Sequence, residues 1–151
     1  MSVFSTPVIP YDPDRLADSK PPEGFEPIVS HSPFGSANGP VFEKRTQDGW
    51  VRGFRVLPHH INAGGSVHGG MLMTFADILL AIAVMEKITP PMVTVRMTTD
   101  FIGRAVLGDW VEGTAVAVSP VDGTIAGQGE ITAPAGVVAS FQGIFKYWQN
   151  R

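Results

Sequence analysis

The stretch from Leu72 to Met85 limits the possible folds of this chain more than any other feature. Every residue in it is apolar except Thr74 and Asp77. A run of this length is too short to span a bilayer and too long for a single strand, so we predict a helix. A helix that is apolar nearly all round must be buried on most of its surface. The remainder of the chain therefore has to wrap around it.

The segments on either side of this helix carry strand patterns. Asp48-Gly49 joins two extended runs and predicts a hairpin, while Pro90-Pro91 ends the helix near Lys87. The expected strands cover residues 40–44, 50–56, 93–101, 110–118, 124–132 and 137–147. One long central helix wrapped by a curved antiparallel sheet in meander spacing is an α+β architecture.

The first strand after the helix has a regular alternation. Val93, Val95 and Met97 alternate with Thr94 and Arg96, which predicts a strand with a period of two. The short run that follows, residues 102–107, is expected only to bridge two turns.

The N-terminal part of the chain differs in composition from the remainder. Eight of the thirteen prolines fall within residues 1–40, which predicts an irregular arm with at most a short helical turn around Asp14 to Asp18. Residues 41–151 are long enough for one domain with a core, and they leave no room for a second catalytic domain.

Composition excludes several classes of function. The net charge of −3 makes nucleic acid an unexpected partner, and the absence of cysteine excludes disulfides and thiolate metal sites. His59, His60 and His68 lack the spacing of metal ligands, so neither a metal nor another cofactor is expected. No secretory signal pattern precedes the arm, no membrane association is indicated, and we expect a cytoplasmic protein.

The residues that suggest chemistry lie between Asn62 and Asp77, in the sequence NAGGSVHGGMLMTFAD. Gly69 and Gly70 stand at the start of the helix, where backbone N–H groups lack intrahelical partners and could bind a polarised carbonyl oxygen. The same glycines could equally serve a tight loop. His68 could transfer protons or hold the loop, and Asn62 could donate to a substrate or cap a turn.

Asp77 is the one carboxylate in the apolar helix, two turns beyond Gly70 and on roughly the same face. Positions 73, 74, 80 and 81 hold no Lys or Arg, so its partner has to come from another strand, another subunit or a water. A desolvated carboxylate can serve as a general base, or it can make a structural hydrogen bond at an interface.

As a spaced set, Asn62, His68-Gly69-Gly70 and Ala76-Asp77 resemble the signature of the PaaI-like branch of hotdog-fold acyl-CoA thioesterases. The resemblance extends over residues 41–148 and includes the Gly108-Asp109 turn. It implies a hotdog fold that hydrolyses an acyl- or aroyl-CoA to the free acid and CoA. It also implies a homodimer with shared active sites, and similar proteins pair into dimers of dimers.

The resemblance also implies roles for individual residues. Gly69 and Asn62 polarise the thioester carbonyl, and Asp77 of the opposite subunit activates water or attacks directly. Thr94 matches a small hydroxyl residue that holds the water, where the family more often has Ser. His68 positions the loop.

Candidate residues for binding the rest of the substrate follow only from their positions in the sequence. Gly70, Met71 and Phe75 are expected near the acyl group, and the basic residues Arg96, Arg104 and Lys146 are candidates for the CoA phosphates. Two other functions stay open. One is a hotdog dehydratase or hydratase that uses His68 with Asp77, and the other is a non-catalytic acyl-CoA-binding module.

Overall fold

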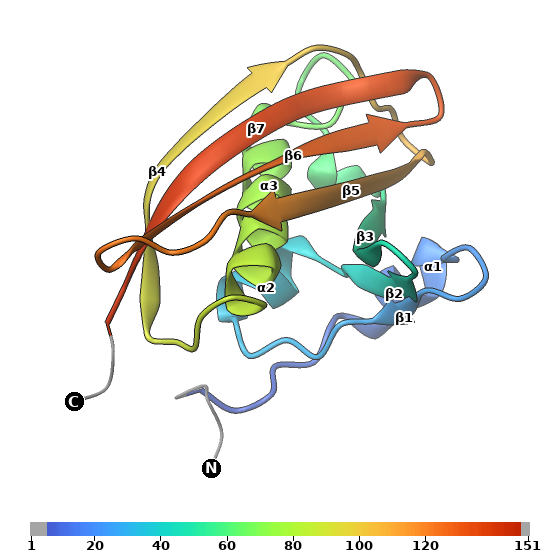
Figure 1. Cartoon of the computed structure of the whole chain (residues 1–151). Coiled ribbons are helices and arrows are strands. Elements are labelled where there is room, and N and C mark those ends of the chain that lie inside the picture. Colours follow the sequence, from blue (N-terminus) through green and yellow to red (C-terminus); the bar gives the residue numbers. More distant parts are fainter. Residues whose placement is uncertain (1–5, 149–151) are drawn as a thin grey trace.

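A computed structural model describes residues 6–148 of the chain, and its centre is a helix held in the curve of a sheet (Figure 1). The long helix α3 (Gly69–Met85) lies against one face of a seven-stranded antiparallel sheet with the order β1-β2-β3-β5-β6-β7-β4. The strands are β1 (Glu26–Pro27), β2 (Phe42–Thr46), β3 (Gly49–Arg55), β4 (Met92–Phe101), β5 (Trp110–Ala117), β6 (Thr124–Ala133) and β7 (Gly136–Tyr147). The predicted α+β hotdog architecture is confirmed.

One side of α3 packs on the sheet and forms the core. Its buried residues recur every three or four positions: Met71, Leu72, Phe75, Ala76, Leu79, Leu80, Ala83 and Val84. Each large apolar side chain that leaves water here contributes about 1.5–3 kcal/mol. The helix can approach closely because glycines face it. A Cβ on Gly113 would lie 2.4 Å from Leu79, and one on Gly143 would lie 2.8 Å from Leu80.

The other side of α3 is covered incompletely in the single chain. Its residues are half-buried or exposed: Met73, Thr74, Asp77, Ile78, Ala81, Ile82 and Met85. We call these seven residues the outer stripe. Five of its members are aliphatic or contain sulfur, so water contact along this stripe carries a free-energy cost.

Strand β4 lies in a different place from the one that a simple meander predicts. It follows α3 in the chain, yet it forms the edge of the sheet beside β7, while β5 pairs with β3. The connection after β4, residues 102–109, returns past the start of α3, where the Val67 N–H donates to the Ala105 carbonyl. As expected, this connection forms no strand of its own apart from one bridge between Ser66 and Val106.

The arm holds more regular structure than the prolines suggest. The expected helical turn is α1 (Pro13–Ser19), but β1 and a second short helix, α2 (Pro33–Asn38), also form. Arg55 of β3 fastens the arm by donating from Nε to the Ser19 carbonyl at 3.0 Å. The prediction of a single helical turn was therefore wrong, because these side-chain contacts and the pairing of β1 with β2 order the segment.

The end of the arm is tied to the loop that leads into α3. A short 3₁₀ turn, η1 (Pro58–His60), presents two histidines. His59 Nε2 contacts the Gly39 carbonyl at 2.8 Å, and His60 Nε2 donates to the Asn38 carbonyl at 2.7 Å. No helix within residues 6–148 is long and apolar enough to cross a membrane.

The buried His60 makes the stability of the fold depend on pH. Its Nδ1 accepts the Leu57 N–H at 3.0 Å, and burial lowers the pKa of His60 from 6.5 to about 4. The unfolded chain thus binds a proton at a higher pH than the folded chain does. We predict that this group's contribution is complete above pH 6.5 and is lost as the pH falls toward 4, by at most about 3 kcal/mol.

Urea unfolding at several pH values checks this prediction. The variant His60→Gln has no group that titrates at this position, so its free energy of unfolding should fall less steeply than the wild-type value between pH 6.5 and 4. Equal slopes for the two proteins would contradict the prediction.

Candidate functional site

The two glycines at the start of α3 differ in their hydrogen bonds. His68 is the N-cap residue, and its Nδ1 accepts the Gly70 N–H at 2.8 Å. The N–H of Gly69 has no hydrogen-bond partner within the described part of the chain. Gly69 therefore offers a donor to a ligand at the positive end of the helix, whereas Gly70 does not.

Asn62 shapes the loop that precedes this helix. Its Oδ1 accepts the N–H groups of Gly64 at 2.9 Å and Ser66 at 3.1 Å. Its Nδ2 has no hydrogen-bond partner among residues 6–148, and the side chain is exposed. The turn thus uses the oxygen of the Asn62 side chain and leaves its amide N–H groups available, so the two roles that the sequence left open are compatible.

Asp77 has its partner on a neighbouring strand. The Thr94 hydroxyl of β4 donates to Asp77 Oδ1 at 2.7 Å. This contact depends on a β-bulge, since Thr94 pairs with Phe145 and Arg96 with Ile144, so that Val95 is the additional residue. Asp77 is half-buried, and its second oxygen accepts no hydrogen bond from the described residues.

The bulge changes the faces that strict alternation predicts for β4. An unbroken strand would place Thr94 on the same face as Arg96. In the structure, Thr94 reaches the helix side and Arg96 lines a hollow on the opposite face of the sheet. Thr94 thus contacts Asp77, while Arg96 is separated from both.

Gly69 and Asp77 of one chain lie more than two helical turns apart. They are separated by eight residues, or about 12 Å along the helix axis. A carbonyl under attack lies about 3 Å from its polarising donor, and the carboxylate acts on it through one intervening water. This separation favours sites in which the donor and the carboxylate come from different chains.

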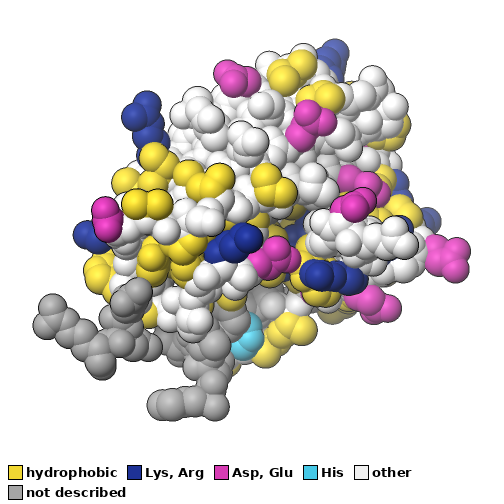
Figure 2. Space-filling model, in the orientation of Figure 1, with side chains coloured by type: hydrophobic (Ala, Val, Ile, Leu, Met, Phe, Trp, Pro, Cys, Tyr) yellow, Lys and Arg dark blue, Asp and Glu magenta, His cyan; other side chains and the backbone are white. Residues whose placement is uncertain are grey.

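Asp77 opens into a groove between α3 and the arm. The groove has a volume of about 980 Å³. From α3 it is lined by Met73, Thr74, Asp77, Ile78, Ala81, Ile82 and Met85, which is the whole outer stripe. From the arm it is lined by residues that include Tyr11, Ile28, Val29 and Phe34. In the same orientation as Figure 1, hydrophobic side chains gather on the visible surface beneath the sheet edge (Figure 2).

Met71 and Phe75, which were predicted near the acyl group, do not line this groove. Phe75 is completely buried and packs edge-on against Phe54, with ring centroids 4.9 Å apart, and Met71 is also in the core. The groove instead uses Met73, which is 39% exposed. The helical period places Met73, not Phe75, on the face of Asp77, and this signal was present in the sequence.

Two of the candidate basic residues make defined contacts within the chain. Arg104 Nε donates to Ser66 Oγ at 2.8 Å, so its guanidinium lies beside the loop of Asn62. Lys146 lies over the Trp148 ring, 5.5 Å from its centroid, on β7. Of the basic residues considered for CoA, Arg104 is thus the one placed next to the helix start.

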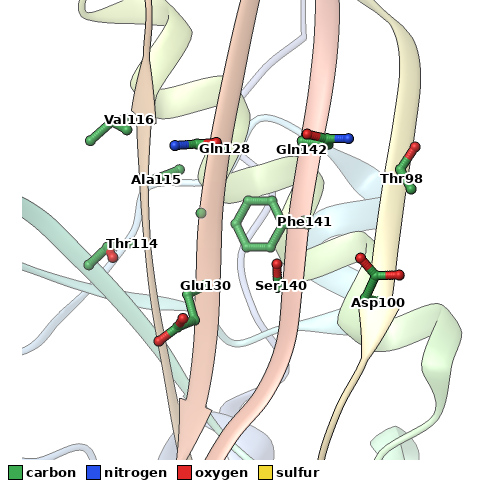
Figure 3. A pocket seen from close by; sticks show the side chains of 11 residues that line it. Thr98, Asp100, Thr114, Ala115, Val116, Gln128, Glu130, Ser140, Phe141 and Gln142 are labelled. Atoms are coloured by element: carbon green, nitrogen blue, oxygen red, sulfur yellow. The ribbon is translucent and has the colours of Figure 1, made fainter.

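A second hollow lies on the sheet face that carries Arg96 (Figure 3). Two rows of side chains cross β5, β6, β7 and β4 there in register: Val116, Gln128, Gln142 and Thr98 form one, and Thr114, Glu130, Ser140 and Asp100 form the other. Arg96 lines a neighbouring hollow on the same face, whereas none of the predicted site residues lines the hollow drawn in Figure 3. Among residues 6–148, no group of three or more His, Asp or Glu could hold a metal ion.

Comparison with known proteins gives the family. The model for the family "Thioesterase superfamily" matches residues 64–119, which contain Gly69, Asp77 and Thr94. A protein of Pseudomonas aeruginosa, named "Putative esterase PA0474", is 43% identical over 94 residues, or 60% of this chain and 70% of that protein. The chain belongs to the thioesterase superfamily.

Solved structures agree with this assignment. The TT0310 protein from Thermus thermophilus is 27% identical, with a TM-score of 0.68 over 79% of this chain and 100% of that one. A variant of the phenylacetic acid degradation protein PaaI from the same organism is 26% identical, with a TM-score of 0.68 over 78% and 100%. The predicted PaaI-like relationship is confirmed, and the similarities support a thioesterase, hence a hydrolase.

The contact between His68 and Gly70 predicts that His68 acts as a cap. His68→Ala should lose about 1 kcal/mol of stability, because the Gly70 N–H loses its acceptor. His68→Asn retains a side-chain acceptor at the N-cap, so its stability and thioester hydrolysis should stay close to wild type. Urea unfolding and thiol-release assays measure the two quantities. If His68→Asn were stable but inactive, a proton-transfer role would replace the capping role.

Proposed function

We propose that this protein hydrolyses acyl-CoA thioesters at sites shared between two copies of the chain. The observation that supports this most directly is the carboxylate of Asp77. Its Oδ1 accepts the Thr94 hydroxyl at 2.7 Å, and the side chain opens into the groove. The resemblance of the set from Asn62 to Asp77 to that of PaaI-like acyl-CoA thioesterases supports CoA as the leaving thiol.

The proposed reaction divides between the two groups. The Gly69 N–H of one chain, with the Asn62 amide, binds the thioester carbonyl oxygen and stabilises the negative charge that develops there. Asp77 of the other chain takes a proton from a water whose oxygen attacks the carbonyl carbon. The carbon–sulfur bond then breaks, the proton passes to the departing thiolate, and the products are the free acid and CoA.

The edge strand β4 supports the dimer. Its backbone has an unpaired side, and Val93 and Val95 are 49% and 60% exposed. An exposed edge with apolar side chains favours pairing with another strand, and a two-fold dimer brings the same edge from both copies. Pairing along β4 would carry the partner's α3 toward Thr94 and Asp77, which lie at this edge and beneath it. A dimer of such dimers belongs to the same proposal.

A hydratase or dehydratase gains no support from the geometry. That chemistry would need His68 to take up a proton, but its Nδ1 accepts the Gly70 N–H, so the neutral ring carries its own proton on Nε2 and has no free basic nitrogen. A non-catalytic acyl-CoA-binding module remains the other outcome of the test below.

Replacement of the carboxylate tests the chemistry. Asp77→Asn keeps the shape and the Thr94 contact but removes the base, so the turnover of a panel of acyl-CoAs should fall about 10²- to 10⁴-fold. Free CoA is measured with a thiol reagent. Asp122→Asn changes a carboxylate in an exposed turn and serves as the matched control. Unchanged turnover by Asp77→Asn would contradict the proposal, and wild-type binding without turnover would indicate the non-catalytic module.

The shared site is tested with a pair of variants of Gly69. Gly69→Pro removes the N–H at the first helical position, where proline is well accommodated, and His68 already has the extended backbone (φ −63°, ψ 135°) that precedes proline. Gly69→Ala keeps the N–H, and its Cβ would meet the Phe101 ring at 3.4 Å, an ordinary contact. We predict an inactive Gly69→Pro and an active Gly69→Ala.

Mixing inactive chains then reports whether two chains form one site. Gly69→Pro and Asp77→Asn chains, unfolded and refolded together in equal amounts, should regain about a quarter of wild-type activity, because half of the dimers carry one intact site of two. Each variant refolded alone is the control. A mixture that stays inactive would show that both residues act within one chain.

A further inference from the structure

A charged cluster lines the groove of Asp77. Glu43 of β2 and Arg52 of β3 face each other in register, and Arg52 Nη2 donates to Glu43 Oε2 at 3.0 Å. The two side chains are only 12% and 27% exposed. Arg52 and Phe54 share the helix-facing side of β3, so a guanidinium stands where an apolar residue would be expected.

The hydrogen bonding of Arg52 is incomplete. Its Nε is buried and has no partner in the described structure, and Glu43 engages one of the other two nitrogens. A guanidinium carries five N–H donors, and within residues 6–148 Glu43 accepts only one of those of Arg52. Burial lowers the pKa of Arg52, and the Glu43 carboxylate opposes this effect. A buried ion pair of this kind is weak evidence for a purely structural role, because apolar residues of similar volume often stabilise a fold equally well.

The cluster and the catalytic carboxylate share one cavity. Tyr11, Glu43 and Arg52 line the same groove of about 980 Å³ as Asp77, and most of the other lining side chains are apolar. Known small-molecule pockets combine a mainly apolar wall with a few polar groups that fix the orientation of the ligand, at volumes of roughly 300–1,000 Å³. The groove fits this description.

We propose that the groove receives the acyl group of the substrate and that Arg52, held by Glu43, selects acyl chains that bear a neutral hydrogen-bond acceptor such as a hydroxyl or keto oxygen. This inference rests on the proposed thioesterase function. A neutral group is favoured over a carboxylate because Glu43 already balances the charge of Arg52. The arm then contributes to substrate choice, since Ile28, Val29 and Phe34 form the opposing wall.

Paired substrates test the selection. Medium-length straight-chain acyl-CoAs, each with and without a terminal hydroxyl, are compared by kcat/KM in the wild type and in Arg52→Met. The wild type should prefer the hydroxylated member of at least one pair by about tenfold or more, the usual effect of a hydrogen bond to a charged group. Arg52→Met should lose this preference, so that the ratio of kcat/KM within each pair falls to about one.

Two further variants separate the possible causes. Arg45→Met removes an exposed cation that does not line the groove and should keep the preference. The double variant Glu43→Gln/Arg52→Met leaves no unpaired buried charge, and it replaces Arg52→Met if that protein does not fold.

The outcomes are distinguishable from a failure of the thioesterase proposal itself. If wild type and Arg45→Met hydrolyse no acyl-CoA, the proposed function fails. If they hydrolyse plain acyl-CoAs without preferring a hydroxylated partner, or if Arg52→Met keeps the preference, the role of Arg52 is wrong. A larger gain from a terminal carboxylate than from a hydroxyl would also overturn it, as would a partner chain found to fill the groove.

Discussion

The structure depends on covering an apolar helix from both sides. The sheet buries the face of α3 that carries Phe75 and Leu79, and glycines on β5 and β7 let the helix approach closely. The outer stripe receives a partial cover from the arm, whose residues from Tyr11 to Phe34 form the opposite wall of the groove. The arm is therefore part of the helix's environment, although its proline content sets it apart from the sheet.

The arm and the start of α3 are connected through one short loop. The carbonyl of His60 accepts the His68 N–H at 2.8 Å, while the His60 ring contacts Asn38 at the end of α2. The N-cap of α3 and the C-terminal end of the arm are thus fixed by the same buried residue. This arrangement places the Gly69 donor on a rigid support, which a group that stabilises developing charge requires.

The sequence predicts elements whose signal is local, and it misses features that depend on distant contacts. The helix, the hairpin at Asp48-Gly49 and the strands follow from periodicity and turn residues, and the structure has them within a few positions. The bulge at Val95 could not be predicted, because it arises from the pairing of β4 with β7. Which of the two N–H groups, that of Gly69 or that of Gly70, is hydrogen-bonded likewise depends on the rotamer of His68. No spacing rule specifies this rotamer. Met73, in contrast, could have been found from the helical period alone.

The position of Asp77 links assembly to chemistry. In a single chain, the carboxylate is half-buried among aliphatic neighbours such as Ile78 and Ala81, which also remain in contact with water. A second copy paired along β4 would approach Asp77 from the strand edge and leave the groove to the acyl chain. The copy and the acyl chain together would remove apolar surface from water and dry the surroundings of the carboxylate. The favourable burial of the stripe can offset the cost of desolvating Asp77 once the substrate is bound. The proposed dimer then supplies both the missing donor and the environment in which the carboxylate acts.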